Sequence, residues 1–162
     1  MVPVQIADRT WLEKAAPEML AMLSRNLILG TLPDDELTSL LKDCVVKEFK
    51  ANRRLSRQGA PVKHIYFIWE GSAKAVFSGR NQSDSWINVN FLQPSSDIGL
   101  LSVVDGGPHS ATVISLEQML VIGIPIESLH RALDQHPDWY QIISHIALAR
   151  LRNLGVWMDN LL

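Results

Sequence analysis

The sequence predicts a mainly β domain of the α+β class, in which a run of strands lies between helices at both ends. Residues 45–124 favour strands, because short apolar segments alternate with Gly and Pro at steady intervals. Residues 10–44 and 125–162 show apolar spacings of three and four residues, which indicate helices. Short, evenly spaced strands are typical of a sandwich, a roll or a barrel.

Two helices are expected before the strands. The first shows a capping-box pattern, with Thr10 three residues before Glu13, and Pro17 is expected to break or restart it. The second begins at Pro33 with acidic residues in its first turn. Its buried face is predicted at Leu37, Leu40, Leu41 and Cys44.

Two segments of the middle region have clear strand patterns. Trp86–Leu92 alternates apolar and polar residues, which predicts a strand half buried through the face that carries Ile87, Val89 and Phe91. Residues 119–124 are apolar on both faces and rich in β-branched side chains, which favours a fully buried strand.

A short helix is predicted over residues 126–133, and a long helix is predicted from Asp138. The long helix has two apolar stripes, so we expect one stripe to cover its own domain and the other to form a homodimer. Arg150 and Arg152 are expected to be solvated. The stripe with near-heptad spacing, expected at the dimer seam, is Ile143, Ala147, Leu151, Leu154, Met158 and Leu161. The stripe expected against the strands is Trp139, Ile142, Ile146, Ala149 and Val156.

Composition narrows the classes of function. The chain has 162 residues, of which 47% are hydrophobic and 20% charged, and this suits one soluble globular domain. Its net charge of -2 is unlike that of a domain that binds DNA by itself. Cys44 is the single cysteine, which excludes an internal disulfide. Residues 1–8 lack a signal-peptide pattern and no segment reaches the about 20 apolar residues of a membrane span, so a cytoplasmic location is expected.

Three segments, in this order, carry a resemblance to a known family. Residues 52–59 are similar to a turn of the form Gly, two residues, Leu, two residues, Gly, with Asn52 at the first Gly. Residues 64–71 are similar to a Tyr-x-Ile-x-x-Gly strand and turn, whose Gly matches Gly71. Residues 99–113 align without a gap to a phosphate-binding cassette. Together they resemble the cyclic-nucleotide-binding domains of the Crp/Fnr transcription regulators.

The resemblance implies a fold and a domain organisation. The fold would be a double-stranded β-helix, or jelly-roll-like β-roll, flanked by N-terminal helices and a long C-terminal dimerisation helix. We expect residues 1–136 to form the roll with its helices and residues 137–162 to form the dimerisation helix. The DNA-binding helix-turn-helix of such regulators is expected outside this chain, so DNA would be a partner only through that other domain.

The resemblance also implies a ligand site. In the family, a Glu after the cassette's first Gly holds the ribose 2′-hydroxyl, and an Arg near the cassette's end pairs with the cyclic phosphate. Leu100 and His109 stand at these two positions. Each lost charged hydrogen bond is worth about 1.5–3 kcal/mol, so we expect weak or absent binding of cyclic AMP and cyclic GMP. The candidate ligand-binding residues are Gly71, Gly99, Leu100, Leu101, His109, Ser110, Ala111 and Asn153.

Several alternatives stay open at this point. Leu100 either suits the pocket to a different effector or marks a pocket filled by side chains. His109 is either a surface-loop histidine or an anion ligand that becomes charged on acidification, near the free N–H groups of the cassette's short helix. Asn153 would touch the ligand across the dimer, fix the register of the helix pair, or face solvent.

The predicted function is that of an effector-sensing, dimerising domain of a transcription regulator, and no enzyme motif is present. One alternative is a dimerisation module without a ligand. The other is a docking domain within a larger signalling protein. Neither a metal nor haem is expected, because no two histidines have metal-site spacing. The histidines are His64, His109, His130, His136 and His145.

Overall fold

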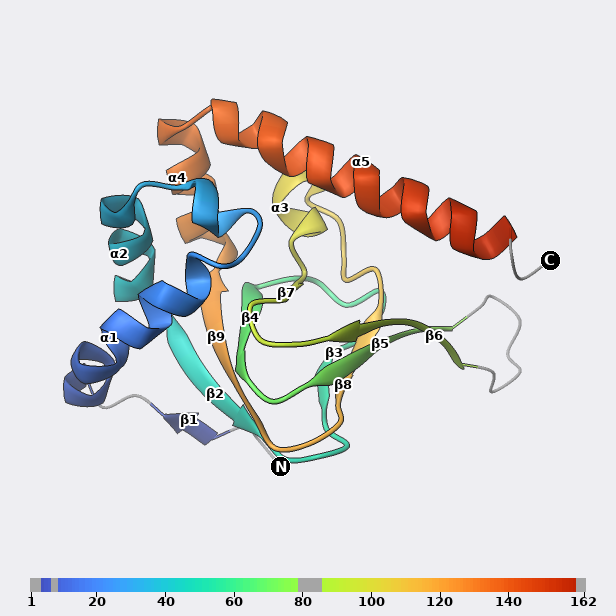
Figure 1. Cartoon of the computed structure of the whole chain (residues 1–162), viewed down its shortest axis with the longest axis horizontal. Coiled ribbons are helices and arrows are strands. Elements are labelled where there is room, and N and C mark those ends of the chain that lie inside the picture. Colours follow the sequence, from blue (N-terminus) through green and yellow to red (C-terminus); the bar gives the residue numbers. More distant parts are fainter. Residues whose placement is uncertain (1–3, 7–8, 79–85, 160–162) are drawn as a thin grey trace.

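The computed structural model describes residues 4–6, 9–78 and 86–159, with side chains for 13–78 and 90–153. It contains two antiparallel sheets with helices packed around one of them (Figure 1), as the β-roll prediction required. The first sheet has the order β1 (Val4–Ile6), β2 (Val45–Phe49), β9 (Met119–Pro125), β4 (His64–Glu70) and β7 (Asp97–Ile98). The second has the order β3 (Arg54–Ser56), β8 (Thr112–Ser115), β5 (Ala73–Ser78) and β6 (Trp86–Leu92).

The helices lie where the apolar spacings predicted them, with one correction. The expected break at Pro17 is wrong, because α1 runs through it without interruption. Pro17 is exposed, so the carbonyl that loses its backbone donor there can be satisfied by water. The helices are α1 (Arg9–Leu23), the short 3-10 helix η1 (Leu29–Thr31), α2 (Asp34–Lys42), α3 (Leu101–Asp105), α4 (Ile126–Gln135) and α5 (Asp138–Asp159).

Strand β4 separates two hydrophobic clusters. Ile65 and Phe67 face the helices and join the cluster formed with α1, α2 and α4, whereas Tyr66 and Ile68 face the second sheet. Successive residues of a strand point to opposite faces, so a strand buried on both sides reads as a continuous apolar run. The same holds for β9, which confirms the prediction of a buried strand over residues 119–124.

The orientation of β6 differs from the prediction. The strand itself is confirmed, but Phe91 is 65% exposed while Leu92 is buried. β6 is the edge strand of its sheet and pairs with β5 across an irregularity at Ala75 and Val76. Its inward positions at this end are Asn90 and Leu92, which face a cavity rather than a closed core. Side chains 86–89 lie outside the described part.

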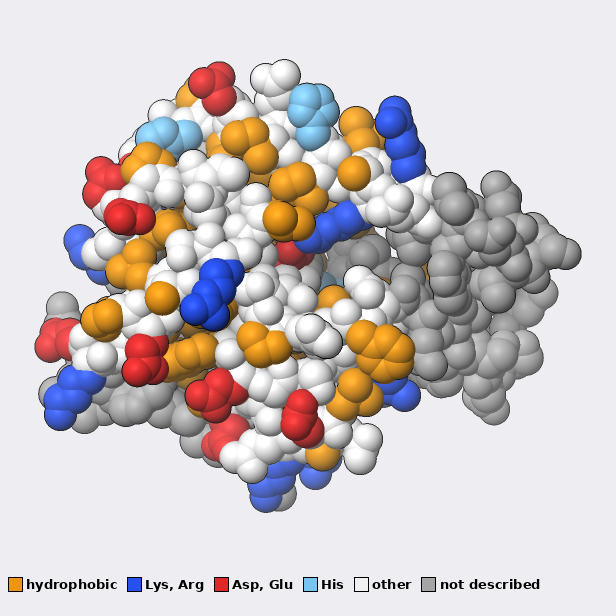
Figure 2. All heavy atoms as spheres, viewed as in Figure 1, with side chains coloured by type: hydrophobic (Ala, Val, Ile, Leu, Met, Phe, Trp, Pro, Cys, Tyr) orange, Lys and Arg blue, Asp and Glu red, His pale blue; other side chains and the backbone are white. Residues whose placement is uncertain are grey.

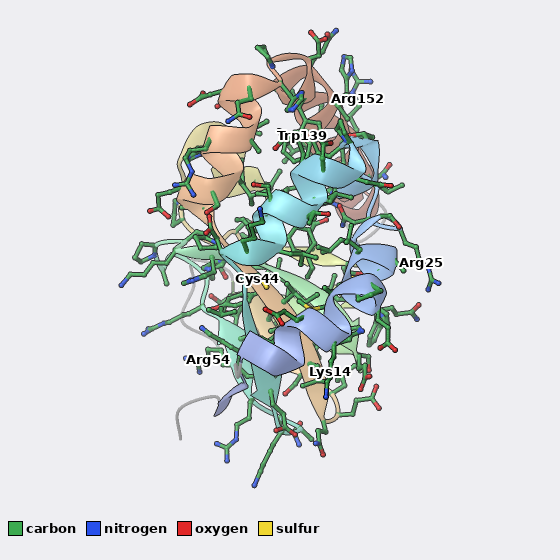
Figure 3. All side chains as sticks on the ribbon, turned by 90° about the vertical axis from the view of Figure 1, so that its left-hand side faces the viewer. Lys14, Arg25, Cys44, Arg54, Trp139 and Arg152 are labelled. Carbon is green, nitrogen blue, oxygen red and sulfur yellow. The ribbon has the colours of Figure 1, made fainter. Side chains whose placement is uncertain are left out.

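Helix α5 runs over the top of the molecule (Figure 1), and Trp139 and Ile143 in its first turns pack into the core. Trp139 is buried as predicted, and its indole N–H donates to the Thr31 hydroxyl at 2.8 Å and to the Ile28 carbonyl at 3.2 Å (Figure 3). Ile143, expected at the dimer seam, is 1% exposed within the single chain. That expectation is wrong, because Ile143 has no surface left to offer a partner.

Further along α5, two leucines are exposed. Leu151, a predicted seam residue, is 55% exposed, and Leu148 is 53% exposed. Ala147 is half-buried, while Ala149 is exposed instead of covering the strands. The predicted seam residues Leu154, Met158 and Leu161, together with Val156, lie outside the described side chains. Over the described residues, no helix is long and apolar enough to cross a membrane.

Candidate effector-binding site

A cavity of about 580 Å³ lies between the β-roll and α5. Its volume is within the range of small-molecule sites, roughly 300–1,000 Å³. Figure 2 shows a hollow on this face below α5, with charged side chains at its rim. The walls come from the second sheet, the turn between β6 and β7, the cassette, the turn after α1, and α5. The predicted ligand residues that line it are Gly99, Leu100, Leu101, His109, Ser110, Ala111 and Asn153.

Gly71 is the predicted ligand residue that does not line this cavity. It lies in the turn between β4 and β5 with a φ of 83°, and a Cβ there would come within 2.6 Å of the Gln118 carbonyl oxygen and of Met119 Cβ. Its role as a ligand residue has no support in the cavity lining and stays a prediction. The turn requires Gly for its backbone conformation and for the close approach of the neighbouring strand turn.

The cassette forms the short helix α3 just after Gly99, as predicted. Its N-terminal N–H groups are not all free. The Ser102 N–H donates to the Gly99 carbonyl at 3.1 Å, and the Val103 N–H donates to the Leu100 carbonyl at 3.0 Å. These two donors already have acceptors, so the anion site expected from free backbone N–H groups is weaker than the sequence implied.

His109 is buried, so its interpretation as a surface-loop residue is wrong. It is 8% exposed, and its backbone is held by hydrogen bonds to Ala60 at 2.9 Å and from Gly59 at 2.8 Å. A Cβ at Gly99 would lie 3.2 Å from His109 Cε1, so the ring packs where Gly99 leaves room. Burial lowers the pKa of His109 below its ordinary 6.5, so the ring is neutral near pH 7.

Leu100 does not fill the cavity. Its side chain is 3% exposed and belongs to the cluster between the helices and the first sheet. The cavity beside it disagrees with the interpretation in which side chains have closed the pocket. Leu100 therefore leaves an apolar patch on one wall of an open site, where the family's Glu would supply a charge.

An ion pair that the sequence did not reveal closes the opposite wall. Arg150 of α5 donates to both carboxylate oxygens of Asp97, at 2.7 and 2.8 Å, and the Asp97 side chain is 3% exposed. The expectation that Arg150 is solvated is wrong. The side-chain amide N–H of Asn26 also donates to the Asp97 carboxylate at 3.4 Å and to the Ser95 carbonyl at 2.8 Å.

Asn26 is itself fixed in place. It is 4% exposed, and its side-chain oxygen accepts hydrogen bonds from the N–H groups of Ile28 and Leu29 at 3.0 and 3.1 Å. The turn after α1, the turn before the cassette, and α5 are therefore joined by one network of polar groups, in which Asn26 and the Asp97 carboxylate are buried and Arg150 is partly exposed. Such networks hold their members in a single geometry when every group is satisfied.

The sequence contained a signal for the residues by which α5 faces the cavity, although the sequence analysis did not predict Arg150 among them. The face that α5 turns towards its own domain is Trp139, Ile143, Ile146, Arg150 and Asn153, with spacings of four, three, four and three. This is the spacing of one helical face, but its last two members are polar. A search for apolar stripes alone therefore stopped before Arg150. The prediction that Asn153 belongs to the site is consistent with its place at the cavity wall.

The charges around the cavity come from three side chains that are charged near neutral pH. Arg25 in the turn after α1 and Arg150 are positive, and Asp97 is negative, so the lining residues that the structure describes carry one net positive charge. Among the residues that the structure describes, no group of three or more His, Cys, Asp or Glu could hold a metal. The arrangement suits binding of a small polar molecule.

A sequence profile of the cyclic nucleotide-binding domain matches residues 46–136 of the chain. This match covers more than half of the chain, and it includes the cassette and all strands from β3 to β9. The chain belongs to the cyclic nucleotide-binding domain family.

Within this family the chain is similar to Crp-like transcription regulators. The global nitrogen regulator of Synechocystis sp. strain PCC 6803 is 29% identical over 104 residues, covering 63% of this chain and 45% of the regulator. A CRP-like cAMP-activated global transcriptional regulator of Mycobacterium tuberculosis is 22% identical over 132 residues, covering 81% of this chain and 58% of the regulator. The chain thus spans about half the length of these curated relatives.

The fold matches a solved regulator of the same kind. The crystal structure of Thermus thermophilus catabolite activator protein superimposes with a TM-score of 0.71 at 17% sequence identity. The match covers 84% of this chain and 63% of that one. The predicted architecture of β-roll, short helix and long helix is therefore confirmed.

Proposed function

We propose that this chain is the effector-sensing, dimerising domain of a Crp/Fnr-type transcription regulator, and that its effector is not held by the usual cyclic-nucleotide contacts. The observation that carries the proposal is the cavity bounded by the cassette on one side and by α5 on the other. A ligand there touches the roll and the long helix together. Binding would shift the population of helix arrangements if the ligand prefers one of them.

The first test measures binding of cyclic AMP and cyclic GMP by thermal shift and calorimetry. Wild-type protein is expected to show little binding, because Leu100 and a neutral His109 replace two charged contacts. His109→Arg restores one of them at a cavity-lining position, so it should raise the affinity for cyclic AMP by roughly 10-fold or more. His109→Gln, which adds no charge, is the matched control. Tight binding of cyclic AMP by the wild type would contradict the proposal.

The second test concerns the dimer. We propose that the exposed Leu148 and Leu151 on α5 form part of a helix–helix seam with a second copy of the chain. Leu148→Glu with Leu151→Glu should yield a monomer in sedimentation experiments, because it places like charges at an apolar contact. His145→Glu, at another exposed position of α5, should leave a dimer intact. A monomeric wild type would refute this part of the proposal.

The third test links the two properties. Spin labels at Gln141, which is exposed on α5, would report the distance between the two long helices. The distance should change when a bound ligand fills the cavity. A distance that no bound ligand alters would favour a dimerisation module without sensing. DNA binding is proposed only for a domain outside this chain, whose own net charge is -2.

A further inference from the structure

The cassette wall of the cavity supplies no charged side chain near neutral pH. His109 is neutral because burial lowers its pKa, and Leu100 is apolar and packed into the core. The N–H groups of Ser102 and Val103 are bonded within the cassette. An anionic group placed against this wall would lose its water without gaining a countercharge, which is costly in a partly buried site.

The wall formed by α5 has the opposite character. A guanidinium group carries five N–H donors, and Asp97 takes two of those of Arg150. Within the described part of the chain, Arg150 has no other acceptor, and it lines the cavity. Three donors thus remain for a ligand, on a group whose orientation is already fixed by a bidentate contact. Fixing a binding group beforehand lowers the entropy lost on binding.

We infer that the effector is a small organic anion whose carboxylate or phosphate is bound by Arg150 at the α5 wall, and not by the cassette. The inference rests on the proposed function, because it names the ligand class of the same cavity. Arg25 adds a second positive charge at the rim. The described lining residues therefore carry one net positive charge after the negative charge of Asp97 is counted. The uncharged remainder of the ligand would face Asn90, Ser96 and Asn153, which supply amide and hydroxyl groups.

The experiment is calorimetric titration of the chain with defined probes. Succinate and citrate represent carboxylates, AMP and inorganic phosphate represent phosphates, and adenosine is the uncharged control. Wild-type protein is expected to bind at least one anion and to bind adenosine more weakly than AMP. The two groups of anions distinguish a carboxylate effector from a phosphate effector.

Variants then locate the anionic group. Arg150→Gln should weaken binding of that anion by roughly 10-fold to 100-fold, the loss expected for charged hydrogen bonds. Asp97→Asn should instead tighten binding by about 3-fold to 10-fold, because it removes a negative charge next to the ligand's own while the amide oxygen can still accept a hydrogen bond from Arg150. The double variant, which keeps an uncharged polar pair, should bind as weakly as Arg150→Gln. His109→Gln, at the cassette wall, should weaken binding far less than Arg150→Gln, and Arg131→Gln, on the exposed face of α4, should leave the affinity unchanged. Thermal unfolding establishes that each variant is folded.

Two results would overturn the inference in different ways. An anion that binds Arg150→Gln as tightly as wild type, but loses affinity in His109→Gln, would place the anionic group at the cassette and leave the proposed sensing function intact. If none of the probes binds the folded wild-type protein, the inference fails. If the distance between labelled α5 helices is then also unaffected by every ligand that stabilises the protein, the sensing function fails with it.

Discussion

The ion pair between Arg150 and Asp97 should contribute measurably to the stability of the fold, and its size can be worked from its surroundings. Removing one partner of a buried pair costs about 3–5 kcal/mol, because the other charge is left buried and unpaired. Asp97 is 3% exposed, but Arg150 is 40% exposed, so water already screens part of this pair. We therefore expect Arg150→Gln to lower the free energy of unfolding by about 2–3 kcal/mol.

The assay is thermal and urea unfolding of Arg150→Gln, Asp97→Asn and the double variant. For a domain of this size each kcal/mol shifts Tm by about 2–4 °C, so the Tm of Arg150→Gln should lie about 4–12 °C below that of wild type. The double variant should be more stable than the sum of the single losses implies, because neither charge is left unpaired. In this double-mutant cycle, we expect a coupling free energy of about 1–2 kcal/mol between Arg150 and Asp97.

The chain provides a matched control in the pair between Arg131 and Asp43. That pair has a similar distance of 2.7 Å, but its side chains are 64% and 46% exposed. Arg131→Gln should therefore cost less than about 1 kcal/mol. If Arg150→Gln cost no more than Arg131→Gln, or if the double variant showed additive losses, the reasoning from burial would be refuted.

Three further predictions concern other parts of the molecule. Gly71→Ala should destabilise the fold more than Gly106→Ala in urea unfolding, because both have positive φ but only at Gly71 would the new Cβ collide, at 2.6 Å, with a neighbouring turn. Trp139→Phe should cost about 1–2 kcal/mol in the same assay, since a phenyl ring cannot make the hydrogen bonds that the indole N–H donates to the Thr31 hydroxyl and the Ile28 carbonyl. The lowered pKa of His109 means that the native state resists its protonation, so its contribution is fully present above about pH 6.5 and is lost as the pH falls from there towards the lowered native pKa. His109→Gln should flatten that part of the plot of unfolding free energy against pH. The contribution of His64, whose pKa is also lowered mainly by burial, should remain in the variant.

The order of elements and the cassette were accessible from the sequence because they depend on local patterns. A left-handed turn needs Gly71, and a helix entrance needs the acids after Pro33, whatever the rest of the chain does. The continuous apolar run of β9 likewise reports burial on both faces. These features follow from period, turn chemistry and capping, which a single sequence displays directly.

The orientation of side chains around the cavity was not accessible in the same way. In β6 the apolar residue Phe91 faces solvent while the polar Asn90 lines the cavity, which reverses the rule that apolar residues point inward. The rule assumes that the inside is a packed core. Where the inside is a polar cavity, polar residues belong on the inward face, and the pattern alone cannot distinguish the two cases.

The ion pair between Arg150 and Asp97 could not be predicted either, because local sequence patterns do not report long-range contacts. Asn26, Asp97 and Arg150 are far apart in the sequence, and each one alone is typical of a solvated surface. They become one hydrogen-bonded network because α5 crosses over the turn between β6 and β7, a long-range contact that no local pattern encodes. His109 was misjudged for a related reason, since its burial depends on the loop containing Gly59 and Ala60.

Arg150 and Leu151 are neighbours on α5 but face different surroundings. Arg150 reaches Asp97 at the cavity wall, whereas Leu151 is 55% exposed on the face proposed to meet a second copy. A helix is rigid over so short a distance, so a ligand that shifted Arg150 together with Asp97 would also turn the apolar face that carries Leu148 and Leu151. In the proposed dimer, the ion pair with Asp97 would then define the ligand-free position of α5. Asp97→Asn should therefore change the distance between labelled helices without any ligand, whereas Arg131→Gln, on α4, should not.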